Sequence, residues 1–130
     1  MIRIEHIAMW TENLDGLSGF YAKYFDATVG PAYHNPSKGY ASRFLAFPSG
    51  ARLELMKTTV LDLVQSAPGA QRMGLTHLAF SVGSEAQVDA LTGRLEQDGV
   101  PVLDGPRRTG DGYYESVVLD PEGNRIEITA

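Results

Sequence analysis

Two histidines and two glutamates occupy matching positions in the two halves of this 130-residue chain. Residues 48–55 (PSGARLEL) recur as residues 121–128 (PEGNRIEI), and residues 5–8 (EHIA) recur as residues 76–79 (THLA). Each half therefore carries one imidazole and one carboxylate, namely His6 with Glu54 and His77 with Glu127. Imidazole and carboxylate are suitable ligands for divalent Zn, Ni, Mn or Fe, so the repeat predicts a four-residue metal site.

The repetition is what favours this interpretation. A single Glu in an alternating strand is almost always exposed to solvent, and a single His is more often a packed or surface residue than a ligand. Here 71 residues separate the two His and 73 separate the two Glu, so the halves superpose almost without insertion. The third histidine, His34, has no repeat partner and lies between Pro31 and Gly39, where we expect a loop.

Composition narrows the function classes. Eleven Lys and Arg against 16 Asp and Glu give a net charge of −5 without a basic stripe, so nucleic acid is not an expected partner. No apolar run approaches the length of a membrane span, and the chain leads from Met1 directly into a strand pattern, which favours a cytoplasmic protein without membrane association. The absence of cysteine excludes disulfides and thiolate ligands.

The same order of elements is expected twice. Residues 1–57 read as a strand (2–10), a helix beginning near the N-cap Asn13, and strands at 28–31, 40–47 and 51–57. Residues 74–130 read as a strand (74–81), a helix capped by Ser84 and stopped by Gly99, and strands at 101–103, 113–119 and 124–129. Residues 58–73 form the linker, with a short helix expected over 59–65.

Strand alternation places the site. In residues 52–56 and 125–129 the aliphatic side chains share one face, which we expect against the helices, while Arg and Glu share the other. His6 shares a face with Trp10 in the first strand.

This element order, the EHIA segment, the helix segment at residues 19–21 (GFY) and the ending at 120–128 (DPEGNRIEI) resemble the vicinal oxygen chelate superfamily. That superfamily includes glyoxalase I, methylmalonyl-CoA epimerase, extradiol dioxygenases and the fosfomycin- and bleomycin-resistance proteins. The resemblance covers essentially the whole chain and is closest to glyoxalase I-like members. It implies an α+β fold of two tandem βαβββ repeats forming an incomplete eight-stranded barrel around a metal-site cavity. In that cavity one divalent ion, with Zn or Ni favoured, is held by His6, Glu54, His77 and Glu127.

The resemblance also implies a function, a glyoxalase-like metal-dependent enzyme acting on a small molecule with adjacent oxygens by isomerase- or lyase-type proton transfer. Glu127 is the first candidate for the base and Glu54 the second, and the protein is expected to be a homodimer. Trp10 and Thr58 stand where glyoxalase I commonly has an Arg and an Asn that contact glutathione, which argues against glutathione specificity.

Two alternative functions stay open, an Fe(II) dioxygenase-type enzyme and a protein that sequesters a drug or aromatic ligand. The sequence also leaves open the roles of five residues on strands or loops near the expected cavity, which are Trp10, Arg43, Arg107, Tyr113 and Tyr114.

Overall fold

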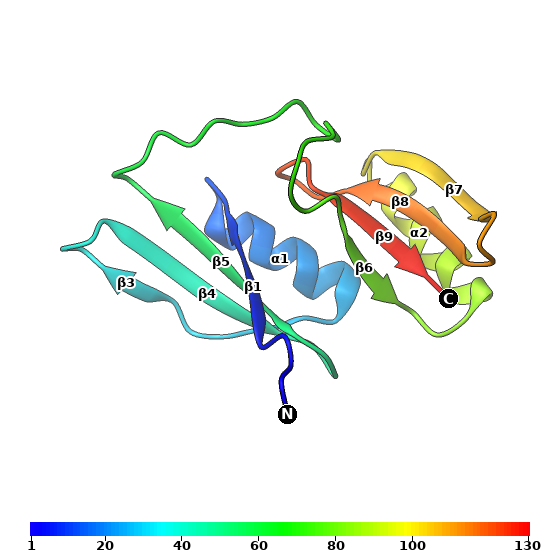
Figure 1. Cartoon of the computed structure of the whole chain (residues 1–130), viewed down its shortest axis with the longest axis horizontal. Helices are drawn as coiled ribbons and strands as arrows, with labels where there is room; N and C mark the ends of the chain where they lie inside the picture. Colours follow the sequence, from blue (N-terminus) through cyan, green and yellow to red (C-terminus); the bar gives the residue numbers. More distant parts are fainter. The chain divides into compact units, whose positions relative to one another are not determined.

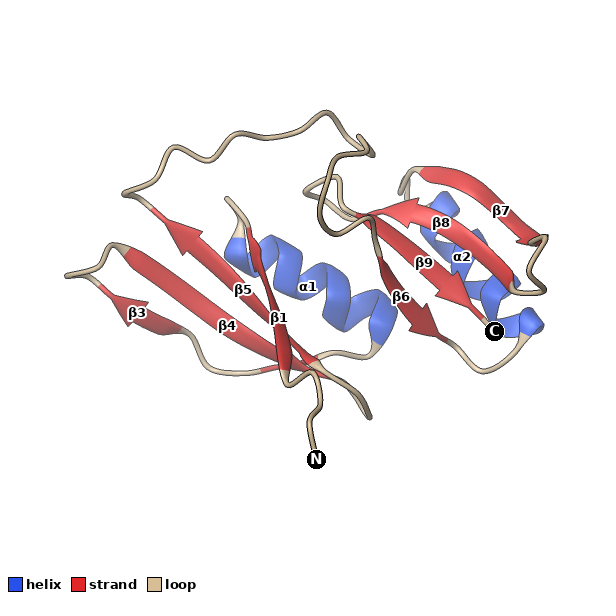
Figure 2. Ribbon diagram, in the orientation of Figure 1, coloured by secondary structure: helices blue, strands red, loops and turns tan.

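The computed structural model describes residues 1–130 as two compact units, Met1–Gln65 and Ser66–Ala130. Each unit consists of one helix and one mixed β-sheet (Figures 1 and 2). The boundary between the units falls inside the linker expected at residues 58–73. The expected α+β fold with two βαβββ modules is confirmed, while the metal-site cavity stays a prediction. No helix has the length and apolar character needed to cross a membrane.

The first unit contains one helix and five strands. In chain order they are β1 (His6–Trp10), α1 (Leu14–Phe25), β2 (Thr28–Val29), β3 (Tyr33–Asn35), β4 (Tyr40–Ala46) and β5 (Arg52–Thr58). The sheet order is β1-β5-β4-β2, and β3 also pairs with β4. Strand β1 runs parallel to β5, while the other pairings are antiparallel.

Helix α1 begins where the sequence predicts. The side chain of Asn13 caps the first turn by accepting a hydrogen bond from the Gly16 amide at 2.9 Å. The buried residues of α1 and the aliphatic residues of the sheet form the core of the unit: Leu17, Phe20, Tyr21, Phe25, Leu45, Leu53 and Leu55. The alternation on β5 therefore holds, because Leu53 and Leu55 lie under α1 and Arg52 and Glu54 project from the opposite face.

The second unit repeats this arrangement. Its elements are β6 (Leu78–Ser81), α2 (Glu85–Gln97), β7 (Val102–Arg108), β8 (Tyr114–Leu119) and β9 (Arg125–Thr129), with the sheet order β6-β9-β8-β7. Ser84 caps α2 through the Gln87 amide at 3.2 Å, as expected from the sequence. The core consists of fully buried aliphatic residues from the helix and the sheet: Val88, Leu95, Val118, Ile126 and Ile128.

A Gly-Pro pair interrupts the edge strand of both units. Gly30 and Pro31 separate β2 from β3, and Gly105 and Pro106 lie in β7 where its pairing with β8 shifts register. Proline has no amide hydrogen to donate, so the ladder cannot continue evenly through either pair. At Gly105 a Cβ would lie 2.5 Å from the backbone oxygen of Glu115, which explains why the position has no side chain.

Several local expectations are wrong, among them the strand expected at 74–81, which begins only at Leu78, and the strand expected at 101–103, which runs to Arg108. The helix expected over residues 59–65 is absent, because the Thr59 amide instead donates to the Gly39 oxygen at 3.0 Å and the run of β-branched residues at 58–60 disfavours helix. His34 is a strand residue and not a loop residue, since β4 extends past β2 and pairs with β3 there. The first strand begins at His6, and residues 2–5 lie outside it.

Candidate metal-binding residues and an adjoining pocket

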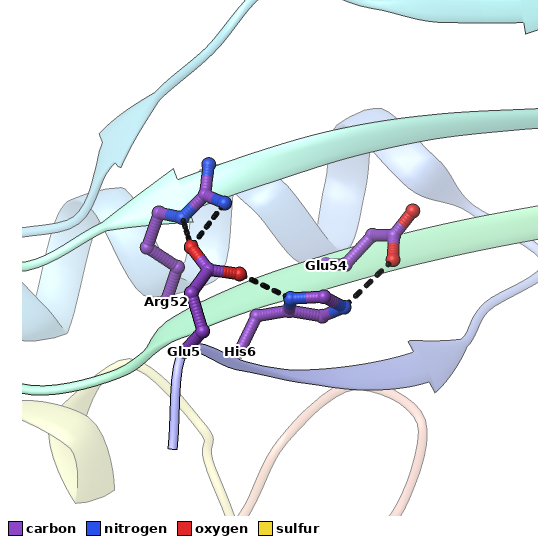
Figure 3. Close-up of polar contacts among 4 residues, drawn as sticks. All are labelled: Glu5, His6, Arg52 and Glu54. Atoms are coloured by element: carbon purple, nitrogen blue, oxygen red, sulfur yellow. Dashed lines mark hydrogen bonds and ion pairs between the residues drawn. The ribbon is translucent and has the colours of Figure 1, made fainter. Parts of the chain in front are cut away.

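The first His–Glu pair lies on the face of its sheet that α1 does not cover. His6 is the first residue of β1, and the parallel pairing aligns Ala8 with Glu54 on β5. Figure 3 shows the imidazole lying beside the Glu54 carboxylate, with Nε2 of His6 3.5 Å from Oε2 of Glu54. Residues from two strands far apart in sequence therefore meet side by side.

The second pair has the same construction. His77 directly precedes β6, and Ala79 aligns with Glu127 on β9 just as Ala8 aligns with Glu54. Nε2 of His77 lies 3.0 Å from Oε2 of Glu127. The sequence repeat is thus also a repeat of strand register.

The spacing within each pair fits ligands of a shared metal ion. Two ligand atoms that each lie about 2.1 Å from one ion are about 3.0 Å apart at a right angle and about 3.4 Å apart at a tetrahedral angle. The observed separations of 3.5 Å for His6–Glu54 and 3.0 Å for His77–Glu127 match these values. In both pairs the His is about two-fifths exposed, whereas the Glu side chain is only 17% or 19% exposed.

No cluster of three or more His, Asp or Glu side chains in the structure has the arrangement of a metal site. Each unit supplies two candidate ligands, whereas a protein-bound Zn ion usually has three or four protein ligands.

Glu5 lies beside the first pair, although the sequence did not predict a role for it. Its Oε2 lies 2.5 Å from Nδ1 of His6, and its Oε1 accepts a hydrogen bond from Nε of Arg52 at 2.8 Å (Figure 3). A carboxylate beside Nδ1 favours the tautomer with hydrogen on Nδ1, which leaves the lone pair of Nε2 on the side of Glu54. The hydrogen bonds from His6 and then from Arg52 lower the pKa of Glu5 below its ordinary value of 4.5.

The second histidine has a neutral neighbour instead. Thr76 stands at the position matching Glu5, and its Oγ1 lies 3.0 Å from Nδ1 of His77. The two imidazoles are therefore oriented by chemically different groups, a carboxylate for His6 and a hydroxyl for His77. Aligning the two repeats shows this difference between Glu5 and Thr76. Because Thr76 is neutral, however, the alignment does not indicate a role for the Glu5 carboxylate.

Glu115 on β8 adds a second carboxylate near the second pair. It lies diagonally across the β8–β9 ladder from Glu127, because its direct partner is Thr129. Partial burial, followed by the neighbouring Glu127 carboxylate, raises the pKa of Glu115 above 4.5. The matching residue in the first unit is Ser42, so this carboxylate has no counterpart there.

A pocket of about 640 Å³ adjoins the first pair. Its lining comes entirely from the first unit: Thr28, Gly30, Pro31, Tyr33, Tyr40, Ser42, Phe44, Ala46, Arg52 and Glu54. The candidate ligand Glu54 is thus also a wall of a mostly apolar pocket. Desolvation raises the pKa of Tyr40 above 10.0, with smaller contributions from Tyr33 and Glu54, so its phenol stays protonated at neutral pH.

The residues of the first unit whose roles were open lie outside this pocket. Arg43 projects from the other face of the sheet, where Nε lies 3.3 Å from Oδ1 of Asp15 and Nη1 donates to the Gly30 oxygen at 3.0 Å. Trp10 is 43% exposed and does not line the pocket. Neither residue contacts the His6–Glu54 pair through any polar bond.

The residues of the second unit whose roles were open lie in or next to strands β7 and β8. Arg107 forms an ion pair with Asp104 at 2.8 Å, and the hydroxyl of Tyr114 donates to Asp89 of α2 at 2.6 Å. Tyr113 is more than half exposed in the loop before β8. Arg107 and Tyr114 thus contact other residues of the second unit.

The chain matches known families and folds along nearly its whole length. The family model described as the glyoxalase/bleomycin resistance protein/dioxygenase superfamily matches residues 3–128. The uncharacterized protein YqjT of Bacillus subtilis (strain 168) is 40% identical over 62 residues, a match that spans 45% of this chain and 48% of that relative.

Solved structures of low sequence identity share the fold. A glyoxylase/bleomycin resistance protein/dioxygenase domain from Frankia sp. EAN1pec has a TM-score of 0.82 at 19% identity, covering 99% of this chain and 97% of that one. The trypanothione-dependent glyoxalase I of Leishmania major has a TM-score of 0.76 at 23% identity, covering 99% of this chain and 86% of that one.

Proposed function

Because the chain belongs to the glyoxalase/bleomycin resistance protein/dioxygenase superfamily, we propose that it is a metal-dependent enzyme of the glyoxalase-like type. It would act on a small molecule with adjacent oxygens by isomerase- or lyase-type proton transfer. The observation that carries this proposal is the repeated His–Glu pair, with its imidazole nitrogen and carboxylate oxygen at 3.5 Å in one unit and 3.0 Å in the other.

In this proposal His6, Glu54, His77 and Glu127 together hold one divalent ion, Zn or Ni by preference. A bound divalent ion supplies Lewis-acid stabilisation of negative charge on two adjacent substrate oxygens. Glu127, or its counterpart Glu54, accepts the proton from the substrate carbon and returns it to the neighbouring position. Both carboxylates are mostly buried and lie beside an imidazole, which supports a role in the site and not on a solvated surface.

The substrate is not expected to be a glutathione adduct. Thr58, at the position of the amide that contacts glutathione in glyoxalase I, uses its hydroxyl to donate to the Gly39 oxygen at 3.3 Å and to accept from the Val60 amide at 3.2 Å. A site that lacks these polar partners does not recognise the polar groups of glutathione. We therefore expect turnover of the hemithioacetal of methylglyoxal and glutathione well below about 10 per second.

Metal analysis tests the ligand set. Protein loaded with Zn and dialysed should retain about one ion for each set of four residues, and both His6→Ala and His77→Ala should lose most of it. His34→Ala is the matched control, because this His lies on β3 and has no carboxylate partner of the repeated kind. Equal metal content in all four proteins would refute the proposal.

Proton transfer is tested by replacing each carboxylate with its amide. Glu127→Gln keeps an oxygen of similar size but cannot accept a proton, so turnover should fall by about two to four orders of magnitude while metal stays partly bound. A much larger loss in Glu54→Gln would assign the base to Glu54. If both variants keep full activity per bound metal, the proton-transfer mechanism is wrong.

We propose further that the protein is a homodimer in which the two His–Glu pairs of one metal site can come from different copies. The strands β1 and β6 that carry or follow the candidate histidines are edge strands, each paired on one side only. Mixing His6→Ala protein with His77→Ala protein should then restore metal binding in part of the heterodimers. A monomeric mass at micromolar concentration would contradict this arrangement.

Sequestration of an aromatic ligand is a second candidate function, favoured by the pocket beside Glu54 and its aromatic lining. The two functions differ in their dependence on metal. A sequestering protein binds its ligand equally well after chelation, whereas the proposed enzyme loses both turnover and binding of adjacent oxygens.

A further inference from the structure

The pocket is built on the open face of the first sheet. On β4, Leu45 points toward α1 and is fully buried, whereas its neighbours Phe44 and Ala46 line the pocket. On β5, Arg52 and Glu54 line the pocket in the same way, since the register places Glu54 opposite Phe44. The strand alternation that buries the core therefore also sets the composition of the pocket.

Aromatic rings form much of the pocket lining. The rings of Tyr33 and Tyr40 lie 5.8 Å apart at 52°, and Phe44 lies edge-on to the imidazole of His6 at 5.3 Å and 83°. Pairs of this geometry offer ring faces and edges on which a further planar ring can stack. His6 of the candidate metal pair is thus in direct contact with a pocket-lining ring.

Both charged side chains of the pocket lining contact residues outside the lining. The guanidinium of Arg52 is hydrogen-bonded to Glu5 and lies over the Phe44 ring at 4.2 Å from its centroid. Glu54 lies beside His6. With both charged side chains of the lining engaged, the pocket favours an uncharged group, and the hydroxyls of Thr28, Ser42 and the two tyrosines supply only neutral polar contacts.

Size and position then define the ligand. A volume of about 640 Å³ lies in the range of roughly 300–1,000 Å³ in which small-molecule sites fall, and it accommodates a substituted phenyl ring with room for its attached atoms. Because Glu54 is both a wall of the pocket and a candidate ligand, a molecule whose adjacent oxygens lie at the metal site projects its next substituent into this pocket.

From this placement we propose that the substrate is an aryl-substituted compound in which an uncharged aromatic ring sits next to the two adjacent oxygens, with the ring held among Tyr33, Tyr40 and Phe44. The adjacent oxygens of this substrate class rest on the proposed function, whereas its aromatic ring rests on the pocket alone. The two parts can therefore be tested separately.

The first experiment isolates the ring. Metal-free protein is titrated with 2-naphthol, which has an aromatic ring system but no adjacent pair of oxygens, and amide chemical shifts are followed by NMR. We expect saturable shifts on β3, β4 and β5, and an affinity reduced about three- to tenfold in Phe44→Leu and in Tyr33→Leu. Tyr113→Leu, an exposed tyrosine of the second unit, is the matched control and should bind as the unaltered protein does.

The second experiment adds the oxygens. Zn-loaded protein is titrated with mandelate and with lactate, which share the same 2-hydroxy carboxylate and differ in a phenyl against a methyl group. Burial of the larger apolar area should favour mandelate about tenfold or more, and the preference should shrink in Phe44→Leu.

The outcomes separate the two ideas. Equal, metal-dependent binding of mandelate and lactate, or no binding of 2-naphthol, would overturn the aromatic substrate class and leave the metal site standing. Binding of 2-naphthol at the pocket, with neither hydroxy acid bound in a metal-dependent way, would support the ring site and refute the proposed metal chemistry.

Discussion

Replacing Glu5 with glutamine tests how the first histidine of the site is oriented. The change removes a negative charge from beside Nδ1 of His6 and keeps the size of the side chain. It also removes the negative partner of the ion pair with Arg52, so the guanidinium is held less firmly next to the imidazole. We expect the metal affinity of the protein to fall while its fold is retained.

The structure sets the size of this effect. Mutation of a group that orients a metal-bound histidine typically weakens metal binding about 10- to 100-fold. Glu5 is half exposed, so solvent screens its charge, and we expect a loss at the lower end of that range, about tenfold. Thr76→Val removes the corresponding hydroxyl beside His77, and because that hydroxyl is uncharged the loss should be smaller, about threefold or less.

Two measurements check the reasoning. Competition with a chelator at pH 7.5 gives the Zn affinity of the unaltered protein, Glu5→Gln and Thr76→Val. In metal-free protein, imidazole ¹⁵N shifts report the tautomer of His6, which should be predominantly the Nδ1–H form and should become mixed in Glu5→Gln. An unchanged affinity together with an unchanged tautomer would show that the 2.5 Å contact does not orient His6.

The remaining predictions concern the second unit. The raised pKa of Glu115 means that the folded state holds this proton more tightly than the unfolded state, so the contribution of Glu115 to stability is fully present below pH 4.5 and is lost as the pH rises through the raised value. Glu115→Gln should therefore stabilise metal-free protein at pH 7 by about 0.2–1 kcal/mol by removing repulsion with Glu127, with no gain at pH 4, as measured by urea unfolding. Thr92→Val leaves the buried Ser116 hydroxyl, now 2.7 Å from Thr92, without a partner and should cost about 1–3 kcal/mol in the same assay. Asp120→Ala removes an acceptor of three 2.9 Å hydrogen bonds in the β8–β9 turn and should lower the unfolding free energy by about 2 kcal/mol. A loss below about 0.3 kcal/mol in either of these two variants would contradict the reasoning.

The sequence predicts the structure correctly wherever local signals, such as helix caps and strand alternation, favour the same conformation as the packing of the unit. Asn13 and Ser84 cap their helices as expected, and the alternation around Glu54 and Glu127 places both carboxylates away from the helices. Internal repetition strengthens these predictions, because the same sequence pattern predicts the same elements separately in each half. The two His–Glu pairs follow from it directly, since matched strand registers bring matched residues together.

Features that depend on cross-strand pairing were beyond the sequence. His34 lies in a short strand because β4 is long enough to accept a second partner, and no local pattern around residue 34 carries that information. The pocket combines side chains from β2 to β5, so its aromatic character emerges only once the registers are known. Glu5 could not be predicted for a different reason. The matching residue in the second half is Thr76, and comparison of the two halves identifies only residues that both halves share.

The edge position of β1 and β6 has a consequence for how fast the proposed metal ion would leave. Each strand has one neighbour in its sheet, and 48 residues separate His6 from Glu54 while 50 separate His77 from Glu127. Pairings this distant in sequence form late in folding, and an edge strand held on one side opens before the interior of the sheet does. Separating an edge strand from its neighbour parts the imidazole from the carboxylate in one step. The rate at which metal leaves should therefore follow the hydrogen-exchange rate of the β1 and β6 amides, so that strengthening an edge strand prolongs retention of the ion even where no ligand is altered.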